Sequence, residues 1–214
     1  MSFVSKISED DLANLRESVK QHMRDGRFTH TLGVEREIAA LGALYLPQDL
    51  MRLRAAALLH DLTKERSYEE QLTLCARGDV HLDEEERRSP KILHALSAPI
   101  VIEEEYPQLA DPAILTAIRQ HTTGDEKMPL FSKLLYLADY IEEGRTFSDC
   151  QRLRYMFWDG IADLPQNKYE EHLNRVLLTS FEMTISSLVE EGAPIAPKTV
   201  AARDALVAEI SNYK

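Results

Sequence analysis

The sequence predicts an all-α fold, a helical bundle in a single domain. Apolar residues recur at helical spacing along most of the chain, and no segment alternates apolar and polar residues as a half-buried strand does. No Asn-Gly or Asp-Gly turn joins two strand-like runs. The 214 residues can bury a full core, and neither a repeat nor a low-complexity linker divides them.

Four helices are expected in the first half of the chain. Ser8 caps an acidic first turn, and the helix that follows carries Leu12, Leu15 and Val19 at helical spacing. A second helix covers residues 28–44. A third begins after Pro47, turns His60 inward with its apolar residues, and continues as far as Lys64. Residues 66–89 are polar and mixed, with a short helix at about 68–75.

Proline and glycine mark the helices of the second half. Pro90 and Pro112 are each expected in a first turn, so helices follow at residues 91–105 and 113–121. A helix at 131–143 turns its apolar stripe inward and stops at Gly144. Further helices are predicted at about 168–191 and 198–210, and no helix is predicted for residues 145–167.

Composition limits the classes of function. There are 25 basic and 36 acidic residues, so the formal net charge is −11. That charge argues against a nucleic-acid polymer or an anionic membrane surface as partner, but it permits a small phosphorylated ligand. The apolar stretches at 55–59 and 134–138 are too short to cross a bilayer, and residues 1–24 lack the apolar segment of a secretory signal. Cys75 and Cys150 form no CxxC pair, so we expect reduced, packed cysteines in a cytoplasmic protein.

Histidines and aspartates carry the candidate chemistry, because no Walker loop, GxGxxG, GxSxG or HExxH motif is present. Burying any one of these side chains without a partner costs free energy. For a single histidine taken alone, a hydrogen-bonded position in the core is the better interpretation. Six together, on four or five helices, favour a shared divalent metal, since imidazole and carboxylate suit first-row ions. The six residues are His30, His60, Asp61, His94, His121 and Asp139.

Other polar residues have two interpretations. Arg27, Lys64 and Arg145 are ordinary surface cations taken singly, but around a metal they would clamp phosphate. Thr122 and Thr123 either offer donors to a ligand or, with Gly124, simply stop a helix. We interpret His22, His81 and His172 as surface residues, Trp158 as packing, and the acidic runs at 83–86 and 103–105 as solvated.

With these residues in place, the chain resembles the HD-domain metal-dependent phosphohydrolases, whose pattern is H…HD…D on a helical core. More narrowly, it resembles the YqeK family of symmetrical bis(5′-nucleosyl)-tetraphosphatases, from about residue 15 to the C-terminus. The segments that carry the resemblance are RFTHTLGV at 27–34, ALLHDLTK at 57–64, IRQHTTG at 118–124, LLYLADYIE with Gly144 and Arg145 at 134–145, and APKTVAAR at 196–203. One departure is Ala98-Pro99, where a Gly-Ala pair is expected, and Pro99 should kink or break its helix.

The resemblance implies one HD domain over residues 1–214, with a core at about 15–145 and C-terminal helices at about 146–214 packing on it. It also implies a first metal, most of all iron, with manganese, zinc, nickel and cobalt as alternatives. The implied ligands of that metal are His30, His60, Asp61 and Asp139. His94 and His121 would hold a second ion or contact phosphate, and Arg27, Lys64, Thr122, Thr123 and Arg145 would bind substrate.

The implied reaction is hydrolysis of diadenosine tetraphosphate to two ADP by metal-activated water, and the protein is expected to form a homodimer. Asp61, Lys64, His94 and His121 would be the catalytic residues. Two alternatives stay open. One is an HD phosphohydrolase that acts on another nucleotide, such as a nucleoside mono- or triphosphate or an alarmone. The other is a nucleotide-binding regulatory module that does not turn over.

Overall fold

The computed structural model describes residues 7–213, and these residues are organised as eleven α-helices and four short 3-10 helices without a strand. The predicted all-α fold is therefore confirmed. Residues 1–6 lie outside the described part, which therefore omits the start of residues 1–24, the segment predicted to hold no secretory signal. The α-helices are α1 (Glu9–Lys20), α2 (Asp25–Tyr45), α3 (Leu50–Leu59), α4 (Tyr68–Arg77), α5 (Glu84–Arg88), α6 (Leu93–Glu105), α7 (Pro112–Gln120), α8 (Leu130–Ile141), α9 (Ser148–Ile161), α10 (Tyr169–Glu190) and α11 (Pro197–Ser211). The 3-10 helices are η1 (Pro47–Asp49), η2 (Pro90–Ile92), η3 (Pro107–Leu109) and η4 (Gln166–Lys168).

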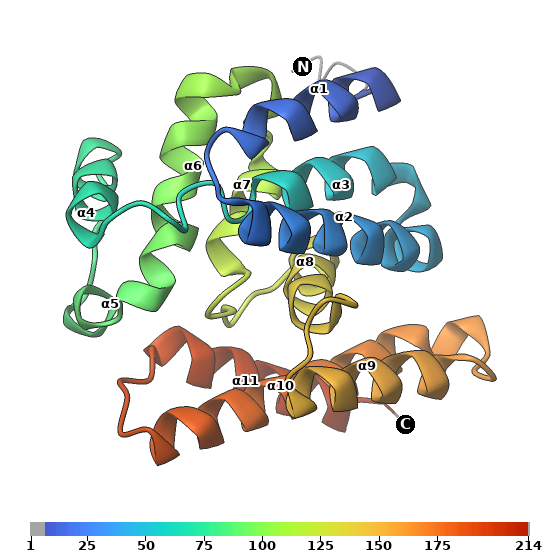
Figure 1. The fold of residues 1–214 in the computed structure, drawn as a ribbon. Helices are drawn as coiled ribbons and strands as arrows, with labels where there is room; N and C mark the ends of the chain where they lie inside the picture. The colour runs from blue at the N-terminus through green and yellow to red at the C-terminus, as the bar shows by residue number, and fades with distance from the viewer. Residues whose placement is uncertain (1–6, 214) are drawn as a thin grey trace.

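Helix α8 lies at the centre and contacts α2, α3, α7 and α9 (Figure 1). Its predicted apolar stripe is wholly buried, from Phe131 to Ile141. Helices α9, α10 and α11 form a layer below it in the view of Figure 1, and α4 and α5 lie to one side, where α4 packs on α6. Helices α2, α3, α6, α7 and α8 therefore surround one core, and each of them ends or begins near the polar cluster described below.

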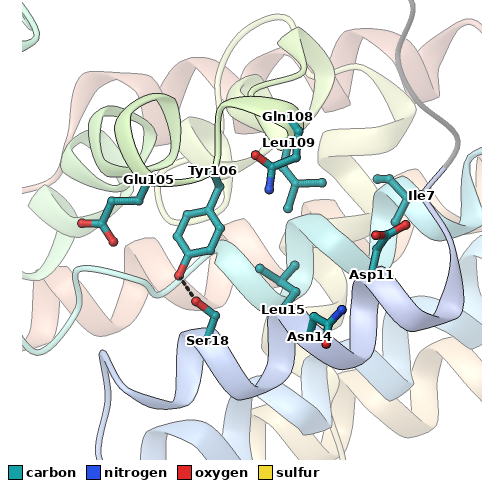
Figure 2. A pocket seen from close by; sticks show the side chains of 9 residues that line it. All are labelled: Ile7, Asp11, Asn14, Leu15, Ser18, Glu105, Tyr106, Gln108 and Leu109. Carbon is teal, nitrogen blue, oxygen red and sulfur yellow. Dashed lines mark hydrogen bonds between the residues drawn. The ribbon is translucent and has the colours of Figure 1, made fainter.

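Helix α1 starts as its sequence predicts. Ser8 and Asp11 cap each other's backbone, and Leu12, Leu15 and Val19 are buried. Its far end is held by a 2.7 Å hydrogen bond between the hydroxyls of Ser18 and Tyr106 (Figure 2). A hollow of about 480 Å³ opens between α1 and the junction of α6 with η3, and none of the predicted functional residues lines it.

The end of α3 differs from the prediction. The helix stops at Leu59, His60 is its C-cap residue, and Lys64 lies in a series of turns rather than on the same helix. In those turns the amides of Leu62, Lys64 and Arg66 each bond to the carbonyl three residues earlier, at 2.9–3.2 Å. Asp61 and Lys64 lie in these turns. Their side chains therefore do not follow the helical spacing that the sequence predicts.

Two helix boundaries and one expected helix break also need correction. Pro90 opens the 3-10 helix η2 rather than α6, which begins at Leu93. Helix α6 then continues unbroken through Pro99, so the expected break is wrong, and His94 stays on the same helix as the buried residues that follow it. Helix α8 ends at Ile141, before Gly144, because Glu142 is extended with ψ of 148°. Two helices, α5 and α9, were not predicted at all.

Burial corrects three further predictions. Glu86 in the acidic run is 4% exposed, because its carboxylate pairs with Lys198 at 2.7 Å and caps the backbone of Asp83. His22 is partly buried beside Tyr106, and His172 is partly buried with its Nε2 bonded to the carbonyl of Phe157. His81 and the run at 103–105 are exposed as expected. Trp158 packs against the core as expected, and both cysteines are free and buried.

The last two helices are tied to α8 by polar and aromatic contacts. Lys133, which is buried, donates to Asn174 on α10 at 3.1 Å and to Glu209 on α11 at 2.6 Å. Tyr136 stacks on Phe181 with ring centroids 4.5 Å apart. The C-terminal helices therefore contribute to the same packed structure that carries the cluster of histidines and aspartates.

Candidate metal centre

Five segments of the fold bring the six predicted residues together. His30 lies on α2, His60 and Asp61 at the end of α3, and Asp139 on α8. His94 lies on α6, and His121 is the C-cap residue of α7. Four of the six are almost fully buried, and His30 and Asp139 are partly buried. The sequence-based grouping is therefore matched by a grouping in space.

The first half of the cluster is formed by His30, His60, Asp61 and Asp139. His30 Nε2 lies 3.0 Å from Asp139 Oδ1 and 3.7 Å from Asp61 Oδ2. His60 Nε2 lies 3.3 Å from Asp61 Oδ2 and 3.9 Å from Asp139 Oδ1. Of these four residues, His30, His60 and Asp139 place their ligand atoms close enough to one another to share one ion, and Asp61 Oδ2 lies beside both imidazole nitrogens.

The second half uses the other oxygen of Asp61. His94 Nε2 is 3.2 Å and His121 Nε2 is 3.9 Å from Asp61 Oδ1, and the two imidazole nitrogens are 3.1 Å apart. Asp61 therefore lies between the two groups and presents one oxygen to each. A carboxylate in that position can bridge two ions, or can join one ion to a ligand.

Backbone contacts fix how two of the histidines face the cluster. His60 Nδ1 donates to the carbonyl of Ala57 at 2.6 Å, and His121 Nδ1 donates to that of Ile118 at 2.7 Å. In the neutral ring this leaves a lone pair on Nε2, directed into the cluster. Among the described residues, the buried Nε2 atoms of His30 and His60 have no hydrogen-bond partner of good geometry. These orphaned nitrogens fit a metal ligand better than they fit a packed core.

Electrostatics hold the carboxylates ionised. Burial alone would raise the pKa of Asp61, but the interactions with His60 beside it, and then with His94 and Lys64, outweigh that effect and hold the pKa well below its usual range. The pKa of Asp139 is likewise held low, because Arg145 and His30 outweigh the effect of burial. Both carboxylates are therefore negative at neutral pH and ready to bind a cation.

The histidines divide into two groups by pKa. Burial lowers the pKa of His30, but the nearby carboxylates of Asp139 and Glu142 outweigh it and raise the value to about 9, so a metal ion bound by His30 would displace a proton from it. Burial lowers the pKa of His121 to about 4, with a further contribution from His60, and it holds that of His94 well below its usual range. His94 and His121 are thus neutral at pH 7, which is the form in which an imidazole binds a metal ion.

Three cations line the cluster as predicted. Arg27 donates to Asp61 Oδ2 at 2.7 Å, and Arg145 donates to Asp139 Oδ1 at 2.5 Å. Lys64 Nζ lies 3.2 Å from His94 Nδ1 and donates to the carbonyl of Lys91 at 3.3 Å. A hollow of about 260 Å³ opens over His30 and is lined by Arg27, Arg145 and the exposed ring of Phe147. Glu65 and Glu142 line the same hollow, so Arg27 and Arg145 bring positive charge to it beside two carboxylates.

The segment from His121 to Gly124 continues the cluster toward the C-terminal helices. Thr122 Oγ1 lies 3.3 Å from His94 Nε2 and 3.2 Å from His121 Nε2. Thr123 is buried, and its hydroxyl bonds to the carbonyl of Gly124 instead of facing the cluster. Gly124 has φ of 67°, and a Cβ there would lie 2.5 Å from Phe181 and 2.8 Å from Ala202, so only glycine fits.

Glu142 is a functional candidate that the sequence reasoning missed. Its carboxylate accepts from His30 Nδ1 at 3.1 Å and from the amide of Gly144 at 2.6 Å, and it is 2% exposed. The carboxylate lies against Gly33, one turn after His30, where a Cβ would overlap Glu142 Oε2. Arg154 on the unpredicted helix α9 donates to the carbonyls of Ile141, Glu142 and Arg145 and so holds this loop. The sequence did point to Glu142, because it is the last residue of the LLYLADYIE segment that carries the family resemblance.

The donor set fits a divalent metal ion. Two groups place their ligand atoms within 4.8 Å of one another, namely His30 with His60 and Asp139, and His60 with Asp61 and His121. Nitrogen and carboxylate donors without sulfur suit first-row divalent ions. The contact between Glu142 and His30 Nδ1 is the kind of outer partner that orients a ligating imidazole.

Comparison with known proteins agrees with the geometry. The HD domain family model matches residues 27–144. The chain is 32% identical to a Halalkalibacterium halodurans protein over 89% of this chain and 94% of that one, and 31% identical to a Bacillus subtilis protein over 85% and 89%. Both relatives are named symmetrical bis(5′-nucleosyl)-tetraphosphatase.

A solved structure agrees with the fold. It is a Clostridium acetobutylicum protein described as a predicted HD superfamily hydrolase involved in NAD metabolism. It superimposes with a TM-score of 0.80 at 29% identity and covers 96% of this chain and 100% of its own.

Proposed function

The chain belongs to the HD domain family, and we propose that it is a metal-dependent hydrolase that cleaves dinucleoside tetraphosphates symmetrically. Diadenosine tetraphosphate and water would give two ADP. The observation that carries the proposal is the position of Asp61, whose two carboxylate oxygens face two separate sets of histidines. Relatives that match this chain over most of its length bear the name of that activity.

We assign the first ion to His30, His60, Asp61 and Asp139, and propose iron, with manganese, zinc, nickel and cobalt as the alternatives. His94 and His121 would hold a second ion beside Asp61 or contact a phosphoryl oxygen. A divalent ion in this set supplies positive charge and Lewis acidity toward water and phosphoryl oxygens. The orphaned Nε2 atoms of His30 and His60 support this assignment.

The chain's own residues would bind and neutralise the phosphate chain. Arg27 and Arg145 already lie within hydrogen-bond distance of Asp61 and Asp139, so their remaining N–H groups can turn to phosphoryl oxygens that lie over the ion. Thr122 offers its hydroxyl beside His94 and His121. In this arrangement catalysis rests on positioning and on charge stabilisation, with no covalent intermediate.

Lys64 is the candidate proton donor to the leaving phosphate. Burial lowers its pKa from the usual value, although Asp61 and Asp139 act in the opposite direction, so Nζ loses a proton more easily than an exposed lysine does. Its place beside His94 puts that proton next to the second half of the cluster. Asp61, Lys64, His94 and His121 are thus the residues we place at the reacting atoms.

The partners and organisation follow from the same proposal. The substrate is a small dinucleoside polyphosphate. A homodimer, a cytoplasmic location, and the absence of nucleic-acid and membrane partners stay predictions. No helix in the described part of the chain is both long and apolar enough to cross a membrane. The contacts of α9 with α8 and α10 support one HD domain over 1–214, with a core at about 15–145 and the helices of 146–214 packed on it.

One assay tests the function. The purified protein, with its metal content measured, is incubated with diadenosine tetraphosphate and with a panel of nucleotides. We expect ADP as the sole product, and its formation should stop when the metal is removed and resume when it is restored. ATP together with AMP would show asymmetrical cleavage and overturn the proposal, and so would binding of the nucleotide without turnover.

A further inference from the structure

The guanidinium of Arg154 donates three hydrogen bonds, and all three end on backbone carbonyls of one short segment. The acceptors are the carbonyls of Ile141 at 2.6 Å, of Arg145 at 2.9 Å, and of Glu142. They lie at the end of α8 and in the loop after it, where a helix leaves its carbonyls without partners in its own backbone. We propose that Arg154 is a positioning residue of the metal centre and orients two of its ligands through this loop. The proposal rests on the metal binding of the proposed function, and it does not depend on which nucleotide is cleaved.

The side chains of the loop contact ligands on two different helices. Glu142 accepts a hydrogen bond from Nδ1 of His30, on α2, at 3.1 Å. Arg145 donates to Asp139, on α8, with Nε to the carbonyl at 3.0 Å and with Nη2 to Oδ1 at 2.5 Å. The ligand atoms beyond these contacts, His30 Nε2 and Asp139 Oδ1, lie 3.0 Å apart in the group that can share one ion. A displaced loop would therefore disturb both ligands at once.

The loop is a single turn that Arg154 holds at both ends. The amide of Arg145 donates to the carbonyl of Glu142 at 3.0 Å, and the amide of Gly144 donates to the Glu142 carboxylate at 2.6 Å. Arg154 donates to the carbonyls of the first and the last residue of this turn. The directions of the Glu142 carboxylate and the Arg145 guanidinium thus depend on backbone that Arg154 holds.

Helix α9 gives Arg154 a fixed base. Leu153 and Phe157, which flank it on the helix, are fully buried. Trp158, one turn further along α9, donates to Glu37 of α2 at 2.7 Å. Because α2 also carries His30, the helix that holds the loop is itself joined to the helix of a ligand.

Arginine suits this role and lysine does not. A guanidinium presents five N–H donors in a rigid plane, whereas an ammonium is a compact charge at the end of a flexible chain. Arg154→Lys therefore keeps the positive charge but loses the geometry that reaches three carbonyls together. A comparison of the two residues separates positioning from an effect of charge alone.

The test measures metal affinity rather than turnover. The original protein, Arg154→Lys and Arg154→Met are freed of metal and titrated with cobalt(II) in competition with a chelator, and the visible absorption spectrum of each cobalt-loaded protein is recorded. We expect both variants to bind cobalt about tenfold more weakly, the low end of the loss typical of an outer partner, and to show an altered spectrum. Arg152→Lys and Arg152→Met are the matched controls, since Arg152 is exposed on the same helix, and they should change neither measurement.

A double-variant cycle tests whether Arg154 acts through the loop. The loss of cobalt affinity in Arg154→Lys combined with Glu142→Gln should be smaller than the product of the two single losses, because two changes that act through one contact are not additive. Losses that multiply would overturn the proposal, since Arg154 would then act independently of Glu142.

Normal affinity with an unchanged spectrum in Arg154→Lys would also overturn the proposal, since the charge alone would then suffice. Circular dichroism establishes that each variant folds, and Arg154→Lys carries the test by itself should Arg154→Met fail to fold. A failure of the proposed function is distinguishable from these results, because the original protein itself would then bind no cobalt or form no ADP from diadenosine tetraphosphate.

Discussion

Glu142 accepts a hydrogen bond from His30 Nδ1 at 3.1 Å and thereby turns His30 Nε2 toward Asp61 and Asp139. The carboxylate is held on its other side by the amide of Gly144. It reaches His30 only because the residue one turn further along α2 is Gly33. A glycine and an acid 109 positions apart in the sequence thus set the direction of one candidate ligand.

Gly33→Ala and Glu142→Gln should therefore weaken metal binding. The Cβ at position 33 would displace the Glu142 carboxylate, and the loss of an outer partner of this kind typically costs about 10- to 100-fold in metal affinity. Chelator-competition titration of the metal-free protein measures the effect. Gly26→Ala, also on α2 with nothing within 4 Å of the new Cβ, should bind metal normally. Normal affinity in Gly33→Ala would show that Glu142 does not position His30.

Asp61→Ala should remove both bound metal and activity while helical content stays largely intact. We expect hydrolysis to fall at least about 100-fold, because each oxygen of Asp61 faces a different set of histidines. Elemental analysis, circular dichroism and the diadenosine tetraphosphate assay are run together. Asp163→Ala, at an exposed position, is the control. If Asp61→Ala retained its metal and its turnover, the assignment of the centre would be wrong.

Glu37→Gln should stabilise the protein at neutral pH. Burial raises the pKa of Glu37 above the usual 4.5, although hydrogen bonding from Trp158 lowers it in part. A carboxyl whose pKa is raised by folding favours the folded state at low pH, and this contribution is lost as the pH rises from 4.5 through the folded-state pKa. Glutamine keeps the acceptor for Trp158 and carries no charge.

The melting temperature of Glu37→Gln should therefore exceed that of the original protein by about 2 °C or more at pH 7. The difference should shrink at pH 4, where Glu37 is protonated in both states. Thermal scans at the two pH values measure it. A difference of the same size at both would show that charge at position 37 is not the cause.

Glu209→Ala should destabilise the protein more than Lys133→Met. Lys133 has a side chain only 6% exposed, so removal of Glu209 leaves a buried ammonium with Asn174 alone, at a cost of about 2 kcal/mol. Lys133→Met instead leaves Glu209, whose side chain is 41% exposed and can be hydrated, so its cost should stay below about 1 kcal/mol. Urea unfolding of both variants gives the comparison, and the reverse order would contradict it.

The sequence predicted the fold class and the grouping of six side chains, because both depend on periodicity and on the cost of burying charge. Helical spacing places Leu12, Leu15 and Val19 on one buried face without any tertiary information. His30, His60 and His121 were grouped because imidazoles on apolar faces need partners, and the structure brings them together with Asp61 and Asp139.

What could not be predicted depends on contacts between distant segments. Helix α9 begins at Ser148 without a side-chain cap, and exposed apolar residues such as Tyr155 and Met156 lie between its four buried ones, so the helical spacing of the buried residues was missed. Glu86 resembles its exposed acidic neighbours in sequence, and only Lys198, 112 positions later, accounts for its burial. Lys64 was assigned to the helix of His60, because the tight turns after Leu59 leave no clear mark in the sequence.

Gly124 has a consequence for the way the protein opens. A Cβ at this position would lie within 2.8 Å of Phe181 and Ala202, so the segment carrying His121 and Thr122 packs directly on α10 and α11. That segment and the two C-terminal helices would then form one cooperative unfolding unit. Partial unfolding of α10 and α11 would therefore also unfold the segment that carries His121 and Thr122. We expect removal of these two helices, the last fifth of the chain, to disrupt the site.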